Sequence, residues 1–127
     1  MNARLLATIL AALLSGLMLS QPAHATSPVE GVWRASDGSG AARIAACSDD
    51  DDTLCATEIT LGSGTPVAGR VVLRDLRQTS ENRWRGRYLL GRDTLPATIE
   101  LRSADLAAMT ACRWLICQTV TYERVSS

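Results

Sequence analysis

The sequence predicts an all-β fold, a small antiparallel up-and-down β-barrel of about eight strands, preceded by a signal-peptide helix. Three observations predict it. From residue 26 onward, clusters of Gly, Pro, Asp, Asn and Ser recur at short intervals and separate runs of strand length. Several runs alternate apolar and polar residues, which is the repeat of a strand with one buried face. No run after residue 25 has helical periodicity.

Residues 1–25 have the pattern of a secretory signal peptide. Arg4 makes the start positive, an apolar run covers 5–19, and Ala23-His24-Ala25 fits a small-x-small cleavage site. The run is shorter than the about 20 apolar residues that cross a membrane, and no cysteine near the cleavage point could carry a lipid. We expect cleavage after Ala25 and one domain over 26–127. The protein would be periplasmic or secreted, without a stable membrane anchor; an uncleaved anchor is the alternative.

The first half of the domain is expected to form strands over residues 31–36, 41–47, 54–61 and 69–77. Asp37-Gly38-Ser39-Gly40 has the composition of a tight turn, because glycine accepts positive φ. An acidic loop over 48–53 follows the second strand. Glycine and proline dominate 62–66, which predicts an irregular connection.

The second half is expected to form strands over residues 83–90, 97–102, 106–112 and 117–125, with turns at 79–82, 91–94 and 103–105. The run 83–90 alternates most clearly. Its inner face would carry Trp84, Gly86, Tyr88 and Leu90, and its outer face Arg83, Arg85 and Arg87. Pairing with the next strand would bring Glu100 near these arginines. The basic stripe is interpreted as a solvated outer face, with an anionic glycan or lipid headgroup as the alternative.

The cysteines are Cys47, Cys55, Cys112 and Cys117, an even set that suits an oxidising compartment. Of the three connectivities, we favour Cys47–Cys55 and Cys112–Cys117, because each pair brackets an expected hairpin turn. Loop entropy would favour the crossed pairings, so energy alone does not decide. Neither pair has the Cys-x-x-Cys spacing that would favour a redox or zinc site.

Two missing residue types argue against catalysis. The sequence has no lysine, and its only histidine, His24, would leave with the signal peptide. A histidine base, a histidine metal ligand and a Schiff-base lysine are then excluded, and we expect neither an enzyme nor a cofactor. Arginine and acidic residues nearly cancel, so no global charge would recruit nucleic acid or a membrane. The acidic run 49–52 is interpreted as a solvated loop, since it lacks the spaced ligands of a calcium loop.

Gly31, Trp33 and Arg124 are expected to close one end of the barrel. Gly31-Val-Trp33 opens the first strand, and Arg124 lies near the end of the last. If Val120 and Tyr122 point inward, so does Arg124, and a buried guanidinium needs a stacking surface. We expect it to lie across the indole of Trp33. A ligand-contacting pair is the alternative interpretation.

The same residues resemble a family of small exported bacterial proteins, the domain-of-unknown-function family number 2147. The matching features are Gly31-Val-Trp33 with the Asp37-Gly38 turn, residues 69–73, Trp84-Arg-Gly86 and residues 112–124, in that order. The resemblance implies a lipocalin- or calycin-like barrel and no established activity. The family usually has tryptophan where Tyr122 stands, and its Asp-Pro-containing segment is shortened here to residues 88–93.

The leading hypothesis is an exported, non-enzymatic binding protein whose lipocalin-like barrel takes a small hydrophobic ligand. Trp33, Trp84, Tyr88 and Tyr122 would line the interior, or would serve only as core. Small residues such as Ala35, Gly86 and Ala97 would leave a cavity or would simply fit the taper.

The alternative is a protein-interaction module, an inhibitor or an envelope-assembly factor. It would act through the disulfide-bounded hairpin tip formed by Arg113, Trp114, Leu115 and Ile116. An apolar tip held at the surface suits a protein or membrane contact, whereas a tip folded over the barrel would be core. This hypothesis predicts that the tip is exposed.

Overall fold

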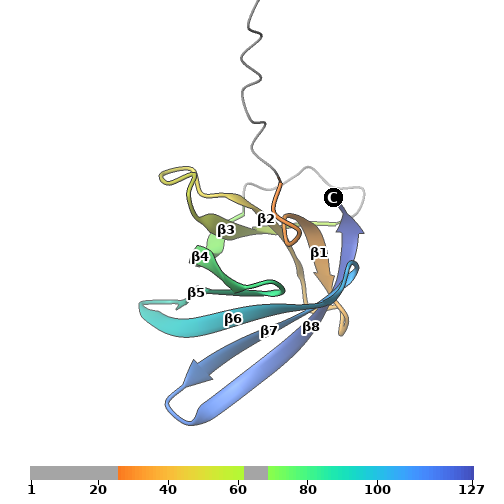
Figure 1. Cartoon of the computed structure of the whole chain (residues 1–127). Coiled ribbons are helices and arrows are strands. Elements are labelled where there is room, and N and C mark those ends of the chain that lie inside the picture. Colours follow the sequence, from red (N-terminus) through yellow and green to blue (C-terminus); the bar gives the residue numbers. More distant parts are fainter. Residues whose placement is uncertain (1–25, 62–68) are drawn as a thin grey trace, which may run out of the picture.

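A computed structural model describes residues 26–61 and 69–127, and these form a closed antiparallel β-barrel of eight strands (Figure 1). The strands are β1 (Gly31–Ala35), β2 (Ala41–Ala46), β3 (Leu54–Ile59), β4 (Val71–Ser80), β5 (Arg83–Leu90), β6 (Asp93–Ser103), β7 (Leu106–Arg113) and β8 (Ile116–Ser126). Each strand pairs with the next, and β8 returns to pair with β1. The expected all-β barrel of about eight strands is confirmed. The expected signal-peptide helix and the loop at 62–66 lie outside the described residues.

No helix in the described part of the chain has the length and apolarity to cross a membrane.

Strand limits differ from expectation mainly around Pro96. The run 83–90 is β5 as expected, but β4 extends to Ser80, and β6 begins at Asp93 rather than at 97. The strand passes through Pro96 because the ladder between β6 and β7 begins only at Ala97. The absent N–H of the proline is therefore not needed by β7. The turn before β6 shortens to Gly91-Arg92, with Gly91 at a φ of 60°.

A β-bulge in β4 shapes one side of the barrel. The register between β4 and β5 shifts between Arg74 and Arg77, and Asp75 there has a φ of 55°. The backbone of β4 comes so close to β5 that a Cβ on Gly86 would lie 2.5 Å from the carbonyl oxygen of Arg74. A glycine is therefore required at position 86 by the neighbouring strand.

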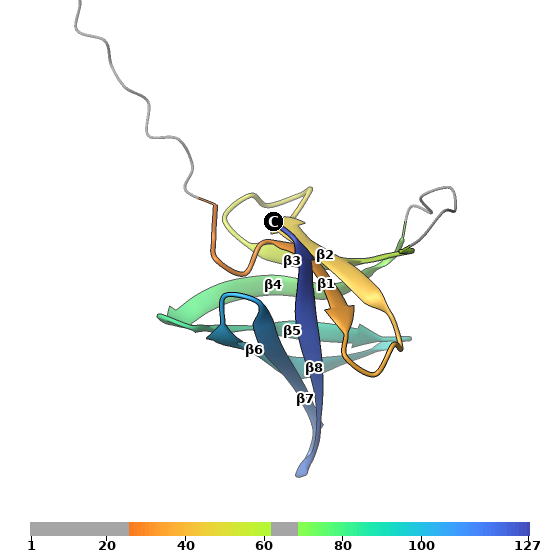
Figure 2. The same cartoon turned by 90° about the vertical axis from the view of Figure 1, so that its right-hand side faces the viewer.

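The two ends of the barrel differ. The closed end carries the β2–β3, β4–β5 and β6–β7 connections, the C-terminus, and the segment before β1, whose Val29 is fully buried. The open end carries the β1–β2, β5–β6 and β7–β8 connections, the end of β3 and the start of β4. Both views show the end of the β7–β8 hairpin on the far side of the molecule from the C-terminus, reaching beyond the other strands (Figure 2).

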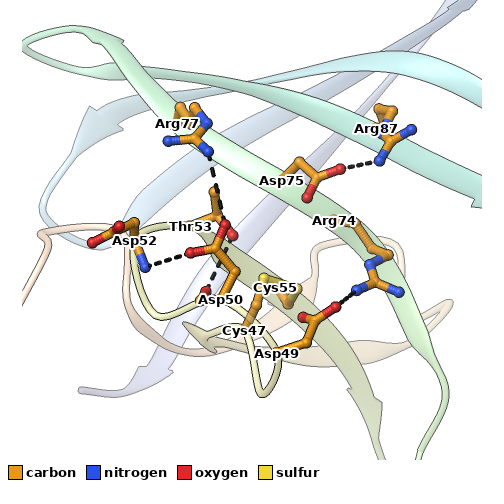
Figure 3. Close-up of a disulfide and its surroundings, with 10 residues drawn as sticks. All are labelled: Cys47, Asp49, Asp50, Asp52, Thr53, Cys55, Arg74, Asp75, Arg77 and Arg87. Carbon is orange, nitrogen blue, oxygen red and sulfur yellow. Dashed lines mark hydrogen bonds and ion pairs between the residues drawn. A yellow bond between two sulfur atoms is a disulfide. The ribbon is translucent and has the colours of Figure 1, made fainter.

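Both expected disulfides are confirmed. Cys47–Cys55 joins the chain just after β2 to β3 across the acidic loop (Figure 3), and both of its residues are buried. Cys112–Cys117 links directly opposed residues of β7 and β8. Each bond therefore closes a local hairpin, as the sequence spacing predicted.

Candidate functional site

Trp33 and Arg124 lie against each other at the closed end, and we call this contact the clasp. The guanidinium carbon lies 4.3 Å from the centroid of the indole, close enough for a cation–π interaction. The guanidinium also donates to the carbonyl oxygens of Ala104 at 2.8 Å, Glu30 at 2.7 Å and Pro28 at 2.5 Å. The clasp thus ties β8 to the segment before β1 and to the β6–β7 turn.

The rest of the closed end depends on the clasp. The indole nitrogen of Trp33 donates to the carbonyl oxygen of Val29 at 2.9 Å, which holds the buried valine over the barrel end. Gly31 has a φ of 133°, and a Cβ there would lie 2.5 Å from the Ser126 carbonyl oxygen and 2.7 Å from the guanidinium of Arg124. Glycine is required here because the φ is positive and the backbone carbonyl of Ser126 would meet a Cβ. The indole nitrogen of Trp33 and the guanidinium of Arg124 thus both have hydrogen-bond partners within the chain.

A cavity of about 530 Å³ lies inside the barrel between the clasp and the open end. Every strand contributes to its wall. Of the residues expected to line it, Trp33, Tyr88 and Tyr122 do so. Trp84 does not: it is 1% exposed and borders a separate hollow at the closed end. Trp84 lies two inward positions nearer the closed end than Tyr88, and it packs within the hydrophobic core.

Small side chains create this space. Alanines at 42, 56, 107 and 111 face the cavity, and the chain has no phenylalanine to fill it. Met109 and Val120 add flexible and branched apolar surface, and Gln118 stands near the mouth. Sequence reasoning passed over Met109, although the inward repeat 107, 109, 111 along β7 could have identified it.

Two tyrosines, Tyr88 and Tyr122, bring phenol groups to the cavity wall. Burial raises the pKa of the Tyr122 phenol, with smaller contributions from Tyr88 and Asp37. A neutral phenol can donate a hydrogen bond to a ligand inside an otherwise apolar wall. Glu58 borders the cavity at its rim and pairs with Arg70 at 3.1 Å. The interior therefore suits an apolar body with few polar atoms.

The acidic loop and the arginines of β4 and β5 neutralise one another on the outer wall. Figure 3 shows Asp49 directed at Arg74, Asp50 at Arg77 and Asp75 at Arg87.

The expected contact between Glu100 and the basic stripe is also present, with Arg83 at 2.6 Å. All these pairs are substantially exposed, so each stabilises the fold by less than about 1 kcal/mol. They form a solvated surface.

The end of the β7–β8 hairpin is exposed. Trp114 is 95%, Leu115 99% and Ile116 74% exposed, and we call these three residues the apolar tip. Arg113 at its base pairs with Asp93 at 3.0 Å. The two-residue turn places Trp114 at a φ of 58°, a conformation that usually selects glycine. The structure therefore brings the residues expected at the tip together on the surface, away from the core.

Comparisons with protein-family models, with curated proteins and with solved structures find no match. The resemblance to family number 2147 stays an expectation.

Proposed function

We propose that the protein is a non-enzymatic binding protein of lipocalin-like type that takes a small hydrophobic ligand inside the barrel. The observation that carries this proposal is the cavity of about 530 Å³, bounded by the clasp at one end and open at the other. Its volume lies within the range of about 300–1,000 Å³ typical of small-molecule sites. A barrel built only for stability would fill this space with larger side chains.

The expected ligand is compact and mostly apolar, with one or two polar atoms. Aromatic rings from Trp33, Tyr88 and Tyr122 would contact its body, and the phenols and Gln118 would hydrogen-bond its polar atoms. No arginine lines the cavity in the part of the chain that the structure describes, which disfavours a ligand whose anionic group must be buried.

Export is part of the proposal. Two disulfides in one small domain are compatible with an oxidising compartment, and the N-terminal pattern favours the periplasm or secretion. The absence of lysine, and of histidine after residue 24, supports a binding role rather than an enzymatic one.

Native mass spectrometry of protein recovered after export of the full chain tests the proposal. We expect a population whose mass exceeds that of the chain by one small molecule, which organic extraction removes. A protein that shows only the mass of the bare chain, and that binds no member of a panel of apolar compounds, would contradict it.

A second candidate function is contact with a partner through the apolar tip. The observation that favours it is the near-complete exposure of Trp114 and Leu115 at the end of a cross-linked hairpin. Consecutive exposed residues of this size mark contact surfaces more often than chance.

A further inference from the structure

The apolar tip costs the fold local stability without adding to its core. A non-glycine residue at positive φ is sterically strained, and Trp114 adopts this conformation at a φ of 58° while its side chain stays 95% exposed. The Cys112–Cys117 bond holds the turn between directly opposed residues. The tip is thus a rigid, pre-formed apolar point, and pre-formed contacts lose little entropy on binding.

The tip also stands free of the barrel wall. The ladder from β6 to β7 stops at Ala111, and β1 pairs with β8 only from Tyr122 onward. Residues 112–117 therefore pair only within their own hairpin. The hairpin end reaches beyond the other strands in both views (Figures 1 and 2). The tip is accordingly convex.

Size and shape favour a lipid surface over a protein partner. The three side chains of the apolar tip expose on the order of 600 Å². A stable protein interface takes roughly 800 Å² from each partner, so the tip alone is too small for one. A protein would also need a deep pocket matched to a convex point, whereas a bilayer accepts such a point without complementary shape. Tryptophan in particular is enriched at the membrane–water interface.

The charges behind the tip suit a headgroup layer. Arg113 lies directly behind Trp114 and pairs with Asp93, and Arg92 lies in the β5–β6 turn at the same end of the barrel. Exposed arginines just behind an inserted apolar tip can contact lipid phosphates. The acidic run 49–52 belongs to the β2–β3 loop at the closed end, away from the surface that the tip would approach.

We propose that the apolar tip inserts into the surface of a lipid bilayer, with Leu115 and Ile116 among the acyl chains and Trp114 at headgroup level. This placement brings the cavity mouth close to the lipid, because Ala111 and Gln118, the pair next to the disulfide, line the cavity. The part of this inference that concerns a ligand rests on the proposed ligand-binding function. A poorly soluble ligand would then enter the barrel from the membrane side rather than from water.

Tryptophan fluorescence provides a direct test. Trp33 and Trp84 are 2% and 1% exposed, so Trp114 is the exposed member of the three tryptophans. The oxidised protein, shown by mass spectrometry to lack residues 1–25, is mixed with phosphatidylcholine vesicles with and without phosphatidylglycerol. We expect the emission to shift to shorter wavelength, acrylamide quenching to decrease, and brominated lipids to quench the signal.

Variants separate insertion from folding. Leu115→Ser/Ile116→Ser should lower the vesicle partition coefficient at least about tenfold, because two large apolar side chains are lost. The matched control Val125→Ser changes an exposed apolar residue at the closed end and should leave partition unchanged. Trp114→Gly relieves the strained φ, so it should stabilise the hairpin while weakening vesicle co-sedimentation. A purely structural tip would not show that combination.

Three results would overturn the inference: no vesicle binding by the native protein, equal binding by the tip variants, or binding that leaves Trp114 open to acrylamide. Protection of Trp114 in lipid-free solution, together with a dimer mass, would show instead that a second copy covers the tip. Soluble-ligand binding, measured without vesicles, separates the two proposals. If it persists when vesicle docking is absent, the docking inference fails and the proposed function stands.

Discussion

Arg124 is the residue on which the closed end most depends. Its side chain is largely buried, donates to the carbonyl oxygens of Pro28, Glu30 and Ala104, and stacks on Trp33. A hydrogen bond from a charged group contributes about 1.5–3 kcal/mol. The bond to the Glu30 carbonyl is part-buried, whereas those to Pro28 and Ala104 are exposed. The single side chain thus joins both termini of the barrel.

We expect Arg124→Ala to lower the free energy of unfolding by about 2–4 kcal/mol, because the clasp and its carbonyl contacts are lost together. Chemical denaturation of the native protein and the variant measures this difference in the free energy of unfolding. Arg102→Ala, which removes an exposed arginine of β6, is the control and should change stability by less than about 0.5 kcal/mol. Equal effects of the two substitutions would mean that the clasp is not a stabilising contact.

Tyr122 gives the fold a pH dependence on the alkaline side. Burial raises the pKa of its phenol in the folded protein, whereas the unfolded chain ionises near the ordinary value of about 10. The stability from keeping the phenol neutral is fully present below that value. It is lost as pH rises through the raised folded pKa, because the unfolded state releases its proton first.

We therefore expect the free energy of unfolding to fall above about pH 10, and Tyr122→Phe to reduce the slope of that fall. Denaturation midpoints over an alkaline pH series provide the measurement. An unchanged slope in the variant would show that the phenol of Tyr122 is not protected by burial.

At the scale of elements, the two disulfides do different work although each closes a short loop. Cys47–Cys55 is buried and anchors the acidic loop to β3, whereas Cys112–Cys117 belongs to a hairpin end without pairing partners outside it. The first bond restrains the barrel, and the second restrains only the apolar tip.

Removing the bonds one at a time should show this difference. We expect Cys47→Ala/Cys55→Ala to cost about 2–4 kcal/mol of stability. We expect Cys112→Ala/Cys117→Ala to cost clearly less, while hydrogen exchange at 113–116 becomes faster. The reverse order of stability losses would place the hairpin end within the cooperative unit of the barrel.

The elements also show which features a sequence can predict. The alternation of 83–90 predicted β5 residue for residue, and cysteine spacing predicted both disulfides. The start of β6 was missed because Pro96 argues against a strand, and its tolerance depends on where the β6–β7 ladder begins. The bulge at Asp75 was missed for a related reason, since only the neighbouring Gly86 makes room for it.

For the whole molecule, closure of the barrel followed from pairing Gly31-Val-Trp33 with Arg124, and the contact is present at 4.3 Å. The cavity could not be derived in the same way. The volume of the cavity depends on the radius of the barrel, which all eight strands set together, and on the size of the inward side chains. No single run of the sequence contains that information. The inward alternation on β5 and β8 located part of the wall, at Tyr88, Val120 and Tyr122, but not the empty space.

Filling the cavity tests the central claim most directly. Fluorescence titration with an uncharged naphthylamine probe is compared for the native protein, Ala111→Trp, which points into the cavity, and Thr110→Trp, which lies on the opposite face beside Thr119. We expect saturable one-site binding by the native protein and by Thr110→Trp. Binding by Ala111→Trp should be at least about tenfold weaker, because the new indole occupies the mouth. Undiminished binding by Ala111→Trp, or no saturable binding by the native protein, would contradict a ligand site inside the barrel.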